Sequence, residues 1–365
     1  MRIIVALLTL AVGCTGTLAI HAQSAPAATL LVLAKRDQTL SIVDPATLNV
    51  LGRVPSGPDP HEVVASADGR FAYISNYGGG AYNTLTVIDL AERKALPPVD
   101  LGALRGPHGL TFVGGKVWFT AEAAKAIGRY DPAAKQVDLV LGTGQNRTHM
   151  IFVSPDLNRI VTSNVNSATM TIIEKAAAGG RGAPQPGTPS RGGGRGGPQG
   201  GDWDATTVAV GRGAEGFDVS PDGKEIWVAN AQDGTISIID VATKKVMQTL
   251  AANAGGANRL KFTPDGKLVL VSTLAGPDLI VFDATAHKER KRVQIGRGAA
   301  GIQVQPDGAR AYIACTPDDY VAAVDLKTLE TAGRIEAGKQ PDGLAWAERR
   351  QRVNSPREAP ATARR

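Results

Sequence analysis

Short runs of alternating apolar and polar residues recur along the chain, and each run ends in an acidic residue. The first two read LSIVD at 40–44 and LTVID at 85–89. Later copies end in Asp131, Glu174, Asp240, Asp283 and Asp325. Alternation with a period of two is typical of a half-buried β-strand. The acidic ends lie 45, 42, 43, 66, 43 and 42 residues apart, which indicates seven repeats of about 43 residues.

A tight-turn motif runs in step with these strands. It reads SPDG at 220–223, and variants of it occur in other repeats. Proline presets φ at the first corner of such a turn, aspartate caps its own backbone, and glycine adopts positive φ. Each repeat therefore contains four short strands. In the fifth repeat we place these strands at 216–220, 224–230, 235–240 and 245–250.

Four strands in a period of about 40–50 residues are typical of one blade of a β-propeller. We therefore predict an all-β fold, a seven-bladed β-propeller of four-stranded antiparallel blades over residues 29–347. The first repeat begins at Thr29 with its second strand. A copy of a first strand follows the last repeat at 341–346, and we expect it to complete the first blade and close the ring, leaving no open edge.

Two segments lie outside the repeat pattern. The single long spacing implies an insertion of 23 residues, which is visible as the Gly-, Arg- and Pro-rich segment 176–201. Such a composition cannot form a core, so we predict a disordered insertion within blade four. We also predict a disordered basic tail at 348–365.

The N-terminal residues have the pattern of an export signal. Met1 and Arg2 precede an apolar run at 3–20, and small residues follow. This pattern predicts a signal peptide at 1–22, a periplasmic or secreted protein, and no transmembrane segment after cleavage. The alternative is a lipoprotein anchored through Cys14.

The net charge of +6 raises the question of nucleic-acid binding. However, the tail 349–365 holds six arginines and one glutamate, the insertion holds three arginines, and Arg2 lies in the leader. The remaining residues therefore carry a small negative charge, and we expect no nucleic-acid partner. We expect a monomer whose partner is a small molecule or another envelope protein. The two cysteines, Cys14 and Cys315, exclude a disulfide framework and a thiolate zinc site.

One column of the repeat alignment carries most of the candidate chemistry. It lies just before each first strand and holds His61, His108, His149, Glu215, Asn258, Ala300 and Asp342. The first strand of a blade is innermost, so these residues are expected to form a ring around the mouth of the central channel. Such a ring could bind an anion, a carbonyl-bearing ligand or a divalent metal ion. Three imidazoles and a carboxylate, those of His61, His108, His149 and Glu215, suit zinc or a similar ion.

The alternative to a ligand site is that these histidines form hydrogen bonds with backbone groups at the channel mouth. A second column, at the ends of the second strands, includes Asn76, Asn164 and Asn230. These asparagines are candidates for the pocket wall, with turn formation as the alternative. Arg147 and Arg259 adjoin the ring and are candidates for neutralising a carboxylate or phosphate.

The repeat consensus, Ser-Pro-Asp-Gly-Lys followed by an aromatic residue, Val-Ala-Asn and then Ile-x-Ile-Ile-Asp, resembles the YVTN-repeat propeller family. The resemblance is strongest at 220–240 and 67–89 and covers all seven repeats. It implies the propeller fold, and the relatives by fold include a lactonase group and cytochrome d1-type haem propellers. The third repeat, at 106–132, is also similar to streptogramin-lyase propellers over about one blade.

The sequence supports three hypotheses of function. The first is an exported scaffold that binds a ligand or partner at the polar ring. The second is a metal-assisted lactonase or lyase, in which the ring holds a metal ion that polarises a carbonyl and a spare histidine acts as a base. The third is a haem-binding redox propeller with a channel-mouth histidine as axial ligand. No catalytic residue can be named from the sequence.

Overall fold

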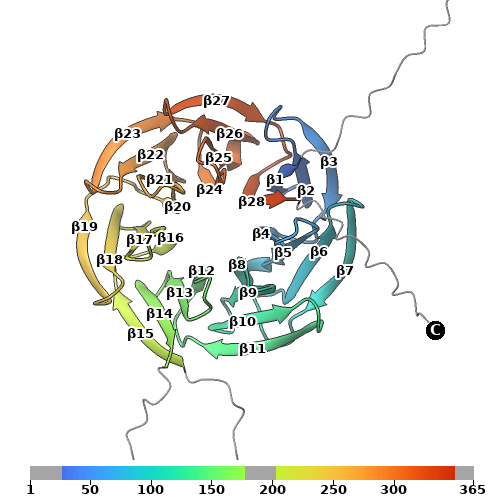
Figure 1. Ribbon diagram of the computed structural model, residues 1–365, viewed down its shortest axis with the longest axis horizontal. Helices are drawn as coiled ribbons and strands as arrows, with labels where there is room; N and C mark the ends of the chain where they lie inside the picture. Colours follow the sequence, from blue (N-terminus) through green and yellow to red (C-terminus); the bar gives the residue numbers. More distant parts are fainter. Residues whose placement is uncertain (1–26, 177–202, 350–365) are drawn as a thin grey trace, which may run out of the picture.

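The computed structural model describes residues 27–176 and 203–349. These residues form seven four-stranded antiparallel sheets that are arranged as blades around a central axis (Figure 1). The predicted signal peptide lies outside the described residues, as do nearly all of the insertion and of the tail. In the described part of the chain, no helix has the length and apolar character needed to cross a membrane.

The strands of each blade run from the innermost to the outermost in a fixed order. Blade one contains β28 (Pro341–Glu348), β1 (Ala28–Ala34), β2 (Thr39–Val43) and β3 (Val50–Pro55). Blade two contains β4 (Pro60–Ala65), β5 (Phe71–Asn76), β6 (Thr84–Asp89) and β7 (Lys94–Asp100). Blade three contains β8 (Pro107–Val113), β9 (Lys116–Ala121), β10 (Ala126–Asp131) and β11 (Gln136–Gly142). Blade four contains β12 (Thr148–Val153), β13 (Arg159–Asn164), β14 (Thr169–Lys175) and β15 (Trp203–Ala209).

The remaining three blades follow the same order. Blade five contains β16 (Ala214–Val219), β17 (Glu225–Asn230), β18 (Thr235–Asp240) and β19 (Lys245–Leu250). Blade six contains β20 (Ala257–Phe262), β21 (Leu268–Thr273), β22 (Asp278–Asp283) and β23 (Lys288–Gln294). Blade seven contains β24 (Ala299–Val304), β25 (Arg310–Cys315), β26 (Tyr320–Asp325) and β27 (Glu330–Ile335). Two short 3-10 helices connect strands on one face, η1 (Gly78–Gly80) and η2 (Thr316–Asp318).

The ring closes as predicted, because β28 pairs antiparallel with β1. Leu30 lies opposite Trp346 and Val32 lies opposite Leu344 in this pairing. Blade one is thus built from both ends of the folded chain. The pairing removes the open edge that β1 would otherwise present to other chains.

The hydrophobic core lies between neighbouring blades. The second and third strands of each blade are buried on both faces, whereas outermost strands such as β11 alternate between exposed and partly buried residues. Trp118 and Trp227 occupy equivalent positions in blades three and five and are both fully buried. Trp118 packs against Ile151 of blade four, and Trp227 packs edge-on against Phe262 of blade six. Aromatic side chains of this size supply much of the packing between blades.

The recurring aspartates are turn residues. The Ser220 hydroxyl donates to Asp222 Oδ1 at 2.7 Å, and Gly223 adopts a φ of 74°. At the end of a third strand, Asp240 Oδ1 accepts a hydrogen bond from the Thr243 backbone N–H at 2.7 Å. The six aspartates that number the repeats therefore stabilise turns, whereas Glu174 pairs with Arg159 and Lys244.

Candidate functional site

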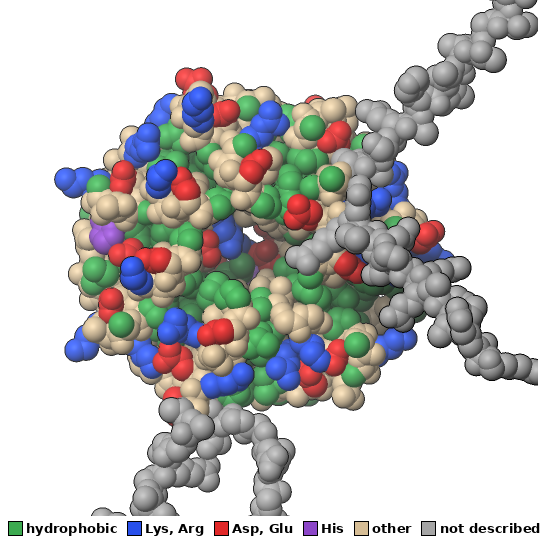
Figure 2. Space-filling model, viewed as in Figure 1, with side chains coloured by type: hydrophobic (Ala, Val, Ile, Leu, Met, Phe, Trp, Pro, Cys, Tyr) green, Lys and Arg blue, Asp and Glu red, His purple; other side chains and the backbone are tan. Residues whose placement is uncertain are grey.

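The seven residues of the predicted ring lie together at the mouth of the central channel. Each is the second residue of an innermost strand, so these strands begin two residues earlier than the sequence pattern indicated. All seven line one cavity of about 380 Å³, which we call the mouth cavity. Its other lining residues are Lys35, Arg147, Arg259, Leu274, Gly298, Thr316 and Pro317. Figure 2 shows the hollow at the centre of the ring.

Contacts between adjacent blades fix the backbone of the ring. A Cβ atom on Gly109, which follows His108, would lie 2.5 Å from the backbone oxygen of His149 in the next blade. Glycine at this position therefore lets two innermost strands approach closely. The Thr120 hydroxyl donates to the same His149 oxygen at 2.6 Å. Equivalent hydroxyl contacts to ring carbonyls come from Ser75, Ser163 and Ser272.

His149 is held between two carboxylates. Its Nδ1 lies 2.5 Å from Glu122 Oε1, and its Nε2 lies 2.8 Å from Glu215 Oε2. Burial alone would lower the pKa of His149, but the contacts with Glu122 and Glu215 outweigh it and raise this pKa. Nδ1 is hydrogen-bonded to Glu122, whereas Nε2 has only the ion-pair contact with Glu215 and no hydrogen bond of good geometry; both contacts favour the charged imidazolium.

Two further side chains complete this cluster of charges. The Tyr77 hydroxyl donates to Glu122 Oε2 at 2.5 Å, and Arg147 Nη1 donates to Glu215 Oε1 at 3.3 Å. Burial would raise the pKa of Glu215, but His149 and then Arg147 lower it to about 2. Burial, followed by the bond to Glu122, raises the pKa of Tyr77 to about 12. The cluster is therefore a closed set of paired charges at neutral pH.

His108 differs from His149 although the two rings touch. Its ring centroid lies 4.0 Å from that of His149, and the side chain is 3% exposed. Burial lowers the pKa of His108 well below 6.5, and the positive charge of His149 lowers it further. His108 is therefore neutral at physiological pH. Among the described residues, its Nδ1 has no hydrogen-bond partner, which is uncommon for a buried polar atom.

His61 is engaged on both sides of its ring. Lys35 Nζ lies 3.0 Å from His61 Nε2, and His61 Nδ1 lies 3.2 Å from the backbone oxygen of Asp59. An ammonium group can only donate, so Nε2 accepts and the Nδ1–H donates to Asp59. Burial and then the nearby Lys35 lower the pKa of His61. Lys35 in turn pairs with Asp342 at 3.2 Å.

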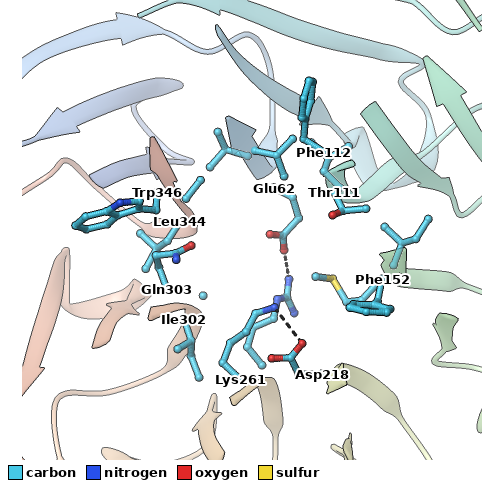
Figure 3. Close-up of a pocket in the computed structure, with 18 of the residues that line it drawn as sticks. Glu62, Thr111, Phe112, Phe152, Asp218, Lys261, Ile302, Gln303, Leu344 and Trp346 are labelled. Carbon is cyan, nitrogen blue, oxygen red and sulfur yellow. Dashed lines mark hydrogen bonds and ion pairs between the residues drawn. The ribbon is translucent and has the colours of Figure 1, made fainter. Parts of the chain in front are cut away.

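An ion pair crosses the channel just beyond the ring. Arg259 of blade six donates through Nη2 to Glu62 of blade two. Arg259 Nη1 donates to Asn258 Oδ1 at 3.1 Å, whereas Nε has no partner in the described part of the chain. Arg259 also lines a second cavity of about 320 Å³, further along the channel. Figure 3 shows this cavity, with Glu62, Asp218 and Lys261 on its wall.

The predicted metal ligands do not present free donor atoms to one ion. His61 Nε2 accepts from Lys35, and both nitrogens of His149 face carboxylates. In the described residues, one group has the spacing of metal ligands, and it consists of His108, Glu122 and His149. The positive charges of His149 and Arg147 adjoin His108 and would repel a cation there. The four predicted ligands therefore do not converge on one ion in this arrangement.

The three asparagines of the second column lie inside the blades. Asn76 Nδ2 donates to the backbone oxygens of Ser56 and Pro58. Asn164 and Asn230 donate to hydroxyl groups of the neighbouring third strands. None of the three lines the mouth cavity, so their predicted ligand contact gains no support from this placement.

The residues that sequence reasoning missed also form a column. The position directly after each second strand holds Lys35, Tyr77, Glu122, Val165, Ala231, Leu274 and Thr316. Three of these residues line the mouth cavity, and Tyr77 and Glu122 belong to the His149 cluster. The variety of residue types at a fixed repeat position is the signal that could have identified them.

Comparison with known proteins supports the propeller class that the fold and site define. Residues 203–310 match the profile described as a YNCE-like beta-propeller. No curated protein matches the chain. A candidate 6-phosphogluconolactonase of Bacteroides fragilis is 17% identical, with a TM-score of 0.67 over 87% of this chain and 97% of that one.

Two other solved structures are similar in fold. A chain of Kuenenia stuttgartiensis hydrazine synthase is 17% identical, with a TM-score of 0.65 over 81% of this chain and 92% of that one. Dihydro-heme d1 dehydrogenase NirN, in complex with DHE, is 16% identical, with a TM-score of 0.58 over 84% of this chain and 63% of that one. These matches confirm the expected resemblance to lactonase-like and cytochrome d1-like propellers. The similarity to streptogramin lyases stays a prediction.

Proposed function

We propose that this protein is an exported propeller that binds a small organic anion in the mouth cavity. The observation that carries the proposal is His108, a buried and neutral histidine whose Nδ1 lacks a partner among the described residues. A neutral imidazole can donate one hydrogen bond and accept another. Nδ1 itself is closed off from the cavity, so a ligand would meet this ring through Nε2, which has no hydrogen-bond partner among the described residues either.

The charges around His108 favour a carboxylate over a cation. His149 carries a positive charge, and Arg147 and Arg259 both depress the pKa of His108 through their charges. Carboxylates accept charge-assisted hydrogen bonds from guanidinium and imidazole groups. The cavity of about 380 Å³ is within the usual range for small-molecule sites.

A second candidate function is proton-transfer chemistry of the lyase or lactonase type. The specific observation in its favour is the contact between a neutral and a charged imidazole, His108 and His149, at 4.0 Å. One ring offers a lone pair and the other offers a proton, which is the combination that acid–base catalysis requires. This version needs no metal ion.

Calorimetric titration of the purified protein with small carboxylates tests the proposal. Replacement of His108 by alanine is expected to weaken binding by about tenfold or more, because a hydrogen bond to a charged group is lost. His287→Ala is the matched control, since this histidine lies outside the cavity and contacts Gln248 and Glu225. Equal binding by the wild type and His108→Ala would contradict the proposal. A Soret band after haem addition that disappears in His108→Ala would favour the haem hypothesis.

A further inference from the structure

The mouth cavity has two chemically different sides. Blades two to five supply its histidines, Glu215 and Arg147, as described above. Blades six and seven supply Leu274, Gly298, Ala300, Thr316 and Pro317 together with Asn258 and Arg259 of β20, and blade one supplies Lys35 and Asp342. Ala300 is the one apolar member of the seven-residue ring. The apolar residues thus form one sector of the cavity, between Asn258 and Arg259 on one side and Lys35 and Asp342 on the other.

Leu274 is the main apolar surface in the second sector. It follows β21 directly, and its backbone N–H donates to Gly256 at 2.8 Å, which fixes its position. The residue is nevertheless 51% exposed, and it lines the cavity. Exposure of a large aliphatic side chain has a cost that ligand contact would relieve. The position is therefore suited to contact with an apolar group.

The neighbouring wall is rigid and offers few free polar atoms. Pro317 belongs to η2, and Gly298 lies so close that a Cβ atom on it would be 2.6 Å from Pro317 Cδ. The Thr316 hydroxyl donates to the Pro341 backbone oxygen at 2.7 Å and is thus already paired. Asn258, at the edge of this sector, accepts from Arg259. A ligand meets mainly carbon atoms here.

Ala300 leaves room on the same side. The six other ring positions carry long or medium polar side chains, whereas Ala300 ends at Cβ. Its backbone oxygen accepts a hydrogen bond from the Ser272 hydroxyl at 2.6 Å, so the main chain keeps the ring geometry. The small side chain therefore widens the cavity toward blade seven without any change in the strand.

We infer that the ligand is an amphipathic carboxylate, with a compact apolar body against Leu274 and Pro317 and its anionic group toward His108 and Arg147. This inference rests on the proposed function and specifies its ligand class. Inorganic anions leave the apolar sector unused. Sugar acids are disfavoured, because hydroxyl groups against this wall would lose their hydrogen bonds to water. Each methylene group buried there is expected to improve binding by about fourfold.

Calorimetry with four probes tests the inference: acetate, gluconate, benzoate and cyclohexanecarboxylate. The two apolar carboxylates are expected to bind at least about tenfold more tightly than acetate or gluconate. Leu274→Ser is expected to reduce this preference severalfold, because benzoate and cyclohexanecarboxylate lose their apolar contact. Met247→Ser is the matched control, because Met247 is 55% exposed on β19 and lies outside the cavity.

The outcomes separate the inference from the proposed function. If acetate or gluconate binds as tightly as benzoate, or if Leu274→Ser keeps the full preference, the inference is overturned while anion binding stands. If none of the four carboxylates binds, or if His108→Ala binds them unchanged, the proposed function fails and the inference fails with it. Both variants alter side chains at the cavity, so circular dichroism confirms that each remains folded.

Discussion

The ring centroids of His108 and His149 lie 4.0 Å apart, yet the protein lowers the pKa of His108 and raises that of His149. The difference comes from their partners, since His149 has a carboxylate at each nitrogen and His108 has none. The charge on His149 also opposes protonation of His108. The pair thus supplies a positive charge and an unpaired neutral ring in one small volume.

Replacement of Glu215 by glutamine should lower the pKa of His149, because one of its two carboxylate contacts is lost. We expect a loss of about 1–3 kcal/mol in the free energy of unfolding at pH 7. The folded-state pKa of Glu215 is lowered to about 2, so its contribution is present above the ordinary value of 4.5 and disappears as pH falls through 2. Urea unfolding at pH 7 and imidazole NMR titration measure the two effects.

Glu289→Gln is a suitable control for this variant, because Glu289 pairs with Arg292 on an outer strand. Exposed pairs of this kind contribute about 0–1 kcal/mol. An unchanged His149 titration in Glu215→Gln would contradict the assigned role of this carboxylate.

The low pKa of His108 should make the fold less stable as the pH falls below 6.5. In that range the unfolded chain binds a proton at this residue and the folded protein does not, so unfolding is favoured. One such group changes the free energy of unfolding by up to about 1.4 kcal/mol per pH unit. His108→Gln removes the titrating group, so its stability should fall less between pH 6.5 and 5.5. Urea midpoints at both pH values give the comparison, and equal slopes would show that His108 is protonated in the fold.

Removal of residues 341–365 should abolish the folded ring, because β28 supplies the innermost strand of blade one. Without β28, the edge of β1 has no partner strand, and the apolar side chains that pack against the buried Leu344 and Ala345 become exposed. We expect an insoluble or partly unfolded product. The control is removal of residues 350–365, which leaves β28 complete and should keep the thermal midpoint unchanged. Gel filtration and thermal unfolding measure both truncations.

The predicted leader gives a test of location. If residues 1–22 are a cleaved signal peptide, the exported protein begins at Gln23. Intact-mass spectrometry of the protein from the periplasmic fraction or the medium measures this N-terminus. A lipid-modified product beginning at Cys14 would support anchoring instead, and an intact N-terminus in the cytosol would contradict export.

The fold was predictable because the same strand and turn patterns recur in successive repeats of the sequence. The acid-ended strand recurs at a nearly constant spacing, so the blades could be numbered, and the copy of a first strand before Ala347 indicated the closure. The ring residues from His61 to Asp342 were predictable for the same reason, since equivalent positions in a propeller meet at the axis.

The chemistry of the ring was less predictable, because it depends on contacts between different columns. Glu122 reaches His149 from the preceding blade, and Lys35 reaches His61. No spacing within one repeat indicates which residue types meet across a blade boundary. The contacts of the asparagine column were also not predictable, since Asn76 binds the Ser56 backbone oxygen and the Thr86 hydroxyl, and its ligand role stays a prediction.

The hydroxyl contacts that hold the ring carbonyls have a consequence for how such a protein can change. In four blades, a hydroxyl group donates to the backbone oxygen of the ring residue in the next blade and does not involve its side chain. These hydroxyl groups belong to Ser75, Thr120, Ser163 and Ser272. A single codon change at a ring position can therefore exchange one chemical group at the channel mouth while the scaffold stays in place. New ligand preferences can therefore arise by substitution at single ring positions, one in each of the seven blades.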